Sequence, residues 1–177
     1  DLEIHKDTSD NHYTIFSLWD TFRATHPLFT IIDQKRTNAF IRTLLRQYQQ
    51  GGKLPIWELS ANYTNCMIGY HSIPVIVDAY AKGIRDYDID MALEAMVYSA
   101  NLDSEGLEYY KEKGFIAASD EPESVSKTVE YAYDDWCIAI MADSLNQPEI
   151  AAQFYQRAQF YKNLYDPETG FLRAKVN

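Results

Sequence analysis

Residues 34–50 read QKRTNAFIRTLLRQYQQ, and this stretch decides the fold class of the 177-residue chain. Its apolar side chains recur at steps of three and four residues, which places them along one face of a helix. The members of this stripe are Phe40, Ile41, Leu44, Leu45 and Tyr48. Two glycines, Gly51 and Gly52, follow directly and are typical of a helix C-terminus. We therefore predict an amphipathic helix over residues 34–50.

Further segments on both sides of this helix carry helix start and stop signals. Gly83 and Gly114 each follow an apolar stripe, and Pro148 opens a segment where its missing N–H is harmless. Ser124 or Ser126 is the candidate cap of the longest segment. Strand-like alternation is weak throughout. The sequence therefore predicts an all-α fold with additional helices over residues 72–82, 88–100, 103–113, 123–145 and 148–163.

Composition limits the classes of function. A chain of this length allows one domain, and 26 acidic against 16 basic residues argue against a nucleic-acid partner. No apolar run reaches the roughly 20 residues that a membrane span requires. The spacing of Cys66 and Cys137 fits no zinc or redox motif, and we expect two buried thiols. The chain opens on acidic residues without Met, which favours a partial piece of a longer protein.

Residues 13–26, YTIFSLWDTFRATH, combine a Trp–Asp pair with an Arg three positions later. A carboxylate beside an aromatic ring can accept two sugar hydroxyls while the ring covers a CH face of the sugar. Asp20 is therefore the first candidate for sugar contact. Its alternative role is the N-cap of a helix over residues 21–30. Arg23 lies on the same helical face and either orients this carboxylate or forms a surface ion pair.

Residues 51–72, GGKLPIWELSANYTNCMIGYHS, repeat this combination of residue types. Trp57 and Glu58 follow Pro55, which favours an extended loop, and loops often carry sites. Glu58 is a candidate for binding a sugar hydroxyl or for general acid catalysis; the alternative is a helix-cap partner or a structural salt bridge. His71 is a candidate hydroxyl ligand, with a satisfied buried histidine as its alternative.

A pair of carboxylates, Asp134 and Asp135, lies inside the longest predicted helix. Neighbouring helix residues point about 100° apart, so the two cannot both flank one glycosidic bond. We expect one of them to face inward, paired with Tyr131 or Lys127, and the other to face solvent. We expect no catalysis here.

Five stretches, in this order, resemble successive segments of the glycoside hydrolase family 92 catalytic domain. They are YTIFSLWDTFRATHPL, LLRQYQQGGKLPIWEL, NCMIGYHS, SVSKTVEYAYDDWCIA and YKNLYDPETGFLRAK. Members of this family are calcium-dependent exo-acting α-mannosidases, many of them α-1,2-specific, with an N-terminal β-sandwich and an (α/α)6 barrel. The resemblance implies that residues 1–177 form about half of one such barrel, without the sandwich and the remaining hairpins. A hydrophobic edge should then be exposed.

The resemblance also implies a division of labour within the parent enzyme. Enzymes of this family hydrolyse the glycosidic bond with inversion of configuration. Their acid and base lie in motifs of the types EGNAWQY and GNDDCGQ, and their calcium motif is of the type GNEP. None of these motifs occurs in this sequence. We therefore expect no catalytic residue and no metal ligand in this segment, and Glu58 is the one remaining candidate for the acid. The segment alone should be inactive. The calcium of the parent would be held elsewhere. The segment should supply substrate-binding residues, namely Asp20, Arg23, Trp57, Glu58 and His71.

The implied partners are a mannose-containing glycan, as in N-glycan degradation, and the remainder of the same catalytic domain. Export to the periplasm, the cell surface or the medium is implied by the resemblance alone. Residues 62–64 read Asn-Tyr-Thr where Asn-Glu-Thr is usual, which puts any contact of that Glu in doubt. Two alternatives remain open: a non-catalytic helical interaction or scaffold module, and another (α/α)6 glycosidase of trehalase-like or glucoamylase-like type.

Overall fold

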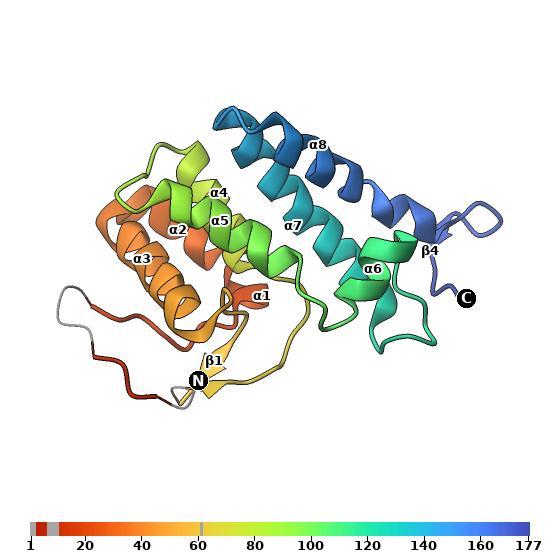
Figure 1. Ribbon diagram of the computed structural model, residues 1–177, viewed down its shortest axis with the longest axis horizontal. Coiled ribbons are helices and arrows are strands. Elements are labelled where there is room, and N and C mark those ends of the chain that lie inside the picture. The colour runs from red at the N-terminus through yellow and green to blue at the C-terminus, as the bar shows by residue number, and fades with distance from the viewer. Residues whose placement is uncertain (1–2, 7–10, 61) are drawn as a thin grey trace. The chain divides into compact units, whose positions relative to one another are not determined.

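The computed structural model describes residues 3–6, 11–60 and 62–177. The chain divides into two compact units, Asp1–Ser99 and Ala100–Asn177, and each is described separately. Helices dominate both units (Figure 1), which confirms the predicted all-α class. Within the described residues, no helix is both long enough and apolar enough to cross a membrane.

The first unit is built from helices and one short hairpin, and α2 packs against α3 and α4. The hairpin pairs β1 with β2 in antiparallel register, with Glu58 opposite Tyr63. The elements of this unit are α1 (Leu18–Thr21), α2 (Thr25–Ile32), α3 (Gln34–Gly51), β1 (Glu58–Leu59), β2 (Asn62–Tyr63), α4 (Ser72–Ala81) and α5 (Ile89–Ala100).

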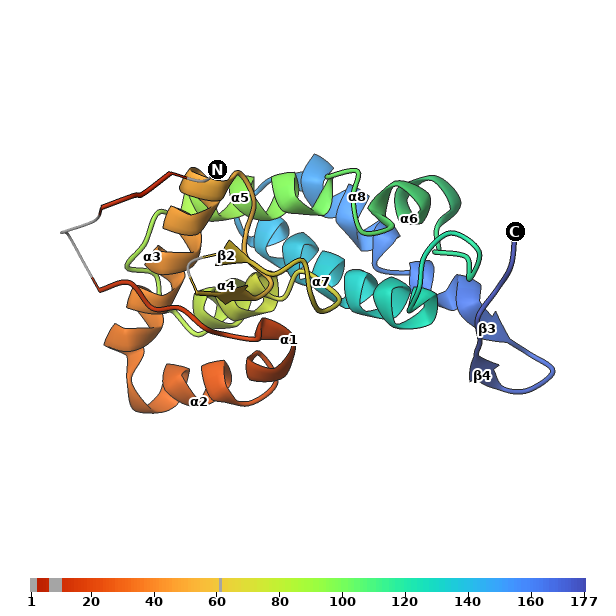
Figure 2. The same ribbon diagram turned by 90° about the horizontal axis from the view of Figure 1, so that it is seen from below.

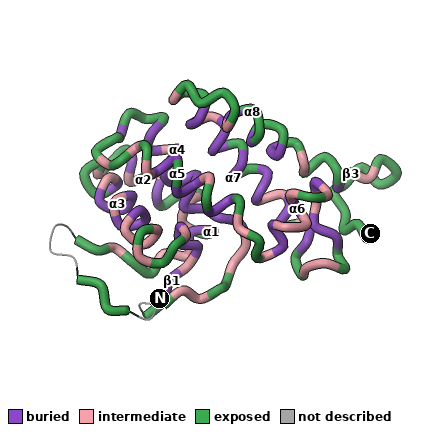
Figure 3. Tube along the Cα trace, in the orientation of Figure 1, coloured by how far each residue is buried: buried purple, intermediate pink, exposed green. Residues whose placement is uncertain are grey.

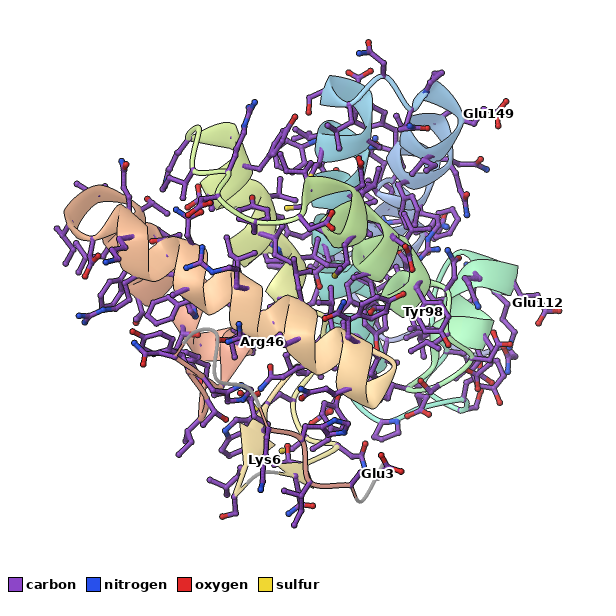
Figure 4. The ribbon with its side chains drawn as sticks, turned by 60° about the vertical axis from the view of Figure 1, so that its left-hand side comes forward. Glu3, Lys6, Arg46, Tyr98, Glu112 and Glu149 are labelled. Atoms are coloured by element: carbon purple, nitrogen blue, oxygen red, sulfur yellow. The ribbon has the colours of Figure 1, made fainter. Side chains whose placement is uncertain are left out.

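Helix α3 confirms the prediction for residues 34–50. Asp33 caps it by accepting a hydrogen bond from the backbone N–H of Arg36 at 3.0 Å. Gly52 ends it in the left-handed region at a φ of 80°, and its N–H donates to the carbonyl of Tyr48 at 2.8 Å. Arg46 projects from α3 (Figure 4), and its Nη2 donates to the Asn11 carbonyl at 2.9 Å. The helix therefore also holds the extended chain that precedes α1.

The predicted single helix over residues 21–30 is wrong, because two helices, α1 and α2, occupy this region. In one continuous helix, Pro27 would lack its N–H and its ring would clash with the carbonyl of Arg23. The chain instead restarts at Thr25, so that the proline falls in a first turn. Ser17 and Ala24 are the N-cap residues of the two helices, and the proposed capping role of Asp20 is also wrong.

The core of the first unit is apolar around α4, most of whose residues are buried (Figure 3). An aromatic cluster lies beside it, in which His26 packs edge-on against Phe16 and Phe40 with ring centroids 4.9 and 5.4 Å apart. His26 is only 3% exposed, and its Nε2 has no hydrogen-bond partner among the described residues. Burial lowers the pKa of His26 to about 4, so its imidazole is neutral at pH 7.

The second unit is centred on a pair of long helices, α7 and α8, which pack together. A short antiparallel hairpin, β3 with β4, lies near the C-terminus (Figure 2). The elements are α6 (Leu107–Lys113), α7 (Ser124–Ser144), α8 (Pro148–Arg157), the 3-10 helix η1 (Phe160–Leu164), β3 (Tyr165–Asp166) and β4 (Phe171–Leu172).

Details of the second unit differ from the predictions at element ends. Glu123, at a φ of 58°, is the N-cap of α7, so neither serine has the predicted role. The segment predicted over 148–163 divides into α8 and η1. Cys137 is buried as expected, whereas Cys66 is exposed and that expectation is wrong. Cys66 lies in the loop that leads into α4 rather than on an apolar helical face, which explains its exposure.

Candidate functional site

The three segments that carry the candidate site residues meet in the first unit through polar bonds. The backbone N–H of Leu18, at the start of α1, donates to the carbonyl of Ile56 at 3.1 Å. The Ser72 hydroxyl, at the start of α4, donates to the carbonyl of Pro55 at 2.5 Å. These hydrogen bonds connect the Trp–Asp motif and the Gly-Tyr-His motif to neighbouring residues of the segment that leads to the Trp–Glu pair.

Asp20 is exposed on the short helix α1. Its Oδ2 accepts a hydrogen bond from the Ser17 hydroxyl at 2.5 Å, a bond within the same helical turn. The hydroxyl fixes the direction of the carboxylate without removing it from solvent. Asp20 can therefore accept hydrogen bonds from a ligand with little rearrangement.

Arg23 is exposed as well, and its guanidinium lies over aromatic rings. The Cζ atom is 4.7 Å from the ring centroid of Trp19 and 4.7 Å from that of Phe22. Both distances fall within the range of cation–π contacts. The expected role of Arg23 in orienting Asp20 stays a prediction.

Trp57 is half-buried in the predicted loop. Its carbonyl accepts hydrogen bonds from Thr64, at 3.2 Å from the backbone nitrogen and 2.7 Å from the hydroxyl. Tyr63, at the position where the family resemblance leads one to expect Glu, lies under the ammonium of Lys53, 3.9 Å from the ring centroid. The hairpin thus fixes the backbone that follows Trp57.

Glu58 is buried, with 8% of its surface exposed, and lies in strand β1 rather than in a loop. Its Oε1 accepts hydrogen bonds from the Thr14 hydroxyl at 2.9 Å and from Gln47 Nε2 at 3.0 Å. These donors come from the extended segment before α1 and from α3. Its Oε2 is buried without a hydrogen-bond partner among the described residues. Glu58 therefore joins three parts of the first unit.

His71 is fully buried and precedes α4 as its N-cap residue. Its imidazole stacks on the ring of Phe22, with centroids 4.3 Å apart and an interplanar angle of 16°. Gly69, at a φ of 75°, lies directly against this imidazole: a Cβ there would approach His71 Cε1 to 2.8 Å. Sequence reasoning assigned no role to Phe22 or to Gly69. For Gly69, its place two positions before a histidine was the available signal.

The Asp134 and Asp135 pair of the second unit differs from the expectation that one would face solvent, because both are fully buried. The two residues predicted as partners of the inward-facing carboxylate also make other contacts. Lys127 pairs with Glu121 at 2.8 Å, and the Tyr131 hydroxyl donates to the Glu105 carbonyl at 3.0 Å.

The charge of Asp135 is balanced by Arg157 of α8. Arg157 donates from Nε to Oδ2 at 2.9 Å and from Nη2 to Oδ1 at 3.1 Å. The Tyr110 hydroxyl also donates to Oδ2, at 2.9 Å, and burial beside this carboxylate raises the pKa of Tyr110. Both oxygens of Asp135 are thus occupied, which supports a structural role.

Two other features bear on where a ligand or a metal could bind. A cavity of about 450 Å³ in the first unit is lined by none of the candidate residues; its lining is Tyr48, Gln49, Asp88, Asp90, Met91 and Glu94. Calcium requires about six to eight oxygen ligands, and no group of three or more His, Cys, Asp or Glu side chains suited to a metal occurs among the described residues.

Comparisons with known proteins identify the family of the chain. The model of the glycosyl hydrolase family 92 catalytic domain matches residues 1–177. The chain belongs to this family, and the resemblance of its motifs is confirmed.

Solved relatives share the fold of the chain at substantial identity. One is a family GH92 α-mannosidase from Bacteroides thetaiotaomicron in complex with mannoimidazole, with 40% identity, a TM-score of 0.94, and coverage of 99% of this chain and 23% of that one. A second is a family GH92 inverting mannosidase of the same organism, with 40% identity, a TM-score of 0.90, and coverage of 94% and 24%. The chain thus spans about a quarter of these relatives.

An uncharacterized secreted glycosidase of Arthroderma benhamiae is 31% identical, over 75% of this chain and 19% of its own length. The match again involves a small part of a longer protein.

Proposed function

We propose that this chain is a segment of an exo-acting α-mannosidase that hydrolyses terminal mannose from glycans with inversion. The observation that carries the proposal is the assembly of the Trp–Asp, Trp–Glu and Gly-Tyr-His motifs in one unit, through the bonds of Leu18 to Ile56 and of Ser72 to Pro55. Family membership supports the reaction class, and the 40% identical relatives are themselves mannosidases.

In this proposal the segment binds the sugar. The exposed carboxylate of Asp20 accepts mannose hydroxyls as charge-assisted hydrogen bonds. Arg23, exposed three positions later in the sequence, braces the carboxylate or donates to the sugar, and the half-buried ring of Trp57 lines the pocket. The buried Glu58 and His71 complete the pocket from behind. Their burial makes the acid role of Glu58 the weaker of its two candidate roles.

The finer parts of the proposal concern the whole enzyme. We expect cleavage of α-1,2 linkages, and a closed (α/α)6 barrel completed by the rest of the catalytic domain. Acid, base and calcium ligands would be supplied by that remainder, so the segment alone would be inactive. Export from the cell is supported by the secreted relative of Arthroderma benhamiae.

The test replaces Asp20 by Ala and by Asn in the full-length protein and measures kcat/KM on α-1,2-mannobiose. Loss of a hydrogen bond to a charged group costs about 1.5 to 3 kcal/mol, or a fall in kcat/KM of about 10- to 150-fold. The matched control is Asp103→Asn, an exposed carboxylate of the second unit. Unchanged kcat/KM in both Asp20 variants would remove Asp20 from the site.

A second measurement tests the reaction class of the protein separately from the role of Asp20. Release of mannose by the unaltered full-length protein tests the class itself, with and without chelator. Release that survives complete removal of calcium would contradict the metal part of the proposal, and absence of release from any α-mannoside would contradict the activity.

A further inference from the structure

A continuous series of ring contacts leads from the interior of the first unit to the exposed guanidinium of Arg23. His71, fully buried, stacks on Phe22 at 4.3 Å. Phe22 in turn contacts the guanidinium, whose Cζ lies 4.7 Å from its ring centroid. Trp19 contacts the same cation at 4.7 Å. We call these four side chains, Trp19, Phe22, Arg23 and His71, the aromatic stack.

We propose that Phe22 is a positioning residue that holds the Arg23 guanidinium in place at the proposed sugar-binding surface, with His71 as its buried support. This inference rests on the proposed function, because it assumes that Arg23 acts at the sugar-binding surface. It assigns His71 a role through Phe22 rather than through direct contact with the sugar.

The physical reason is the flexibility of an exposed arginine. An arginine side chain that is free in solvent samples many rotamers, and ordering it on ligand binding costs conformational entropy. Two aromatic faces at cation–π distance restrict those rotamers before the ligand arrives. Arg23 is exposed whereas His71 is buried, so Phe22 connects the solvent side to the interior.

His71, which supports Phe22, has little room to move within the first unit. Gly69 lies against the imidazole so closely that even a methyl group would come within 2.8 Å of Cε1. The Ser72 hydroxyl, next along the chain, is bonded to the carbonyl of Pro55 at 2.5 Å. The position of the imidazole is therefore limited by the backbone at Gly69 and by the stacked ring of Phe22.

A purely structural role for Phe22 predicts a different outcome from a positioning role. Phe22 as core packing would lower stability when truncated and would affect activity whether or not Arg23 is present. Phe22 as a positioning residue acts through the guanidinium, so its effect on kcat/KM disappears once the guanidinium is removed. A double-mutant cycle separates these outcomes.

The experiment measures kcat, KM and the unfolding midpoint of full-length Phe22→Leu, Arg23→Ala and the double variant, with α-1,2-mannobiose as substrate. We expect Phe22→Leu to lower kcat/KM about 2- to 5-fold, the range of one cation–π contact at an exposed site. In the Arg23→Ala background the same substitution should change kcat/KM less than twofold. Phe22→Tyr, which keeps the ring face, should retain activity.

The matched control is Phe29→Leu. Phe29 also lies beneath an exposed arginine, with Arg36 Cζ 5.7 Å from its ring centroid, but it is outside the aromatic stack. We expect this control to leave kcat/KM unchanged. If Phe22→Leu lowers the unfolding midpoint strongly, Trp19→Leu takes its place in the cycle, since Trp19 contacts the same guanidinium.

Two results would overturn the inference, and they are distinguishable. A full effect of Arg23→Ala with an equal loss from Phe22→Leu in both backgrounds would leave the proposed function standing and remove the positioning role. An Arg23→Ala variant with unchanged kcat/KM would show that Arg23 has no part in the site. The Asp20 variants would then decide the proposed function independently.

Discussion

Lowering the pH from 7 to 5 is expected to destabilise the first unit through one side chain, His26. The imidazole is 3% exposed among aromatic rings, and burial lowers its pKa to about 4. In the unfolded chain the same group has a pKa of about 6.5. Below pH 6.5 the imidazole is protonated in the unfolded state but stays neutral in the folded state. The free energy of unfolding therefore falls as the pH falls, and the loss is complete below about pH 4.

The size of the effect follows from these two pKa values. Linkage gives a loss of about 2 kcal/mol between pH 7 and pH 5, and about 3 kcal/mol once both states are fully protonated. Replacing His26 by Leu removes the titrating group at similar volume. The variant should also lose the buried Nε2, which has no hydrogen-bond partner among the described residues, and should be at least as stable at pH 7.

The assay compares urea unfolding of the wild-type protein and His26→Leu at pH 7 and pH 5. The difference in free energy of unfolding between the two proteins should shift by about 2 kcal/mol in favour of the variant at the lower pH. His12→Gln, at an exposed histidine, is the control. Deuterium exchange at the imidazole C2, followed by mass spectrometry, reads the pKa directly. A midpoint near 6.5 for His26 would refute the reasoning.

Two further perturbations test other parts of the chain. Gly69→Ala should lower stability by more than Gly83→Ala, because both glycines have positive φ but only the first lies against an imidazole ring; strain alone costs about 1 to 2 kcal/mol, and equal thermal unfolding midpoints would contradict the close contact. Arg157→Leu should cost about 3 to 5 kcal/mol in urea unfolding because it leaves the Asp135 carboxylate buried without its counter-charge. Arg173→Leu, which breaks an ion pair at the surface, should cost much less than Arg157→Leu, and similar losses in the two variants would contradict this.

Long amphipathic elements were predictable because their signals are local. The stripe and the double glycine of residues 34–52 define α3 almost to the residue, since both the buried face and the left-handed end are written in consecutive side chains. The family was predictable for a different reason: five ordered motifs carry residue identities as well as periodicity, and the family model matches the whole chain.

The errors arose where a distant contact or a backbone clash decides the outcome. The break between α1 and α2 depends on which carbonyl the ring of Pro27 would meet, and a stripe of apolar residues does not contain that information. One carboxylate of the Asp134 and Asp135 pair was wrongly expected to face solvent, because the counter-charge that allows Asp135 to be buried, Arg157, lies 22 positions later on another helix. Two-residue strands such as β1 carry too little alternation to be seen in sequence.

Within the candidate site, residue types were easier to predict than their depth. The motifs drew attention to Glu58 and His71, but nothing in the sequence distinguished these buried side chains from the exposed Asp20 and Arg23. Depth depends on what packs over a residue, and for His71 that neighbour is Phe22, from another segment.

The bond between Leu18 and Ile56 joins backbone atoms only, and it therefore does not depend on which side chains flank it. In the proposed function, substitutions among the exposed positions near Asp20 change which sugar groups this surface binds, while the main-chain framework beneath them is retained. Sugar preference would then change by single surface replacements, without a compensating change in the way the two segments are held together.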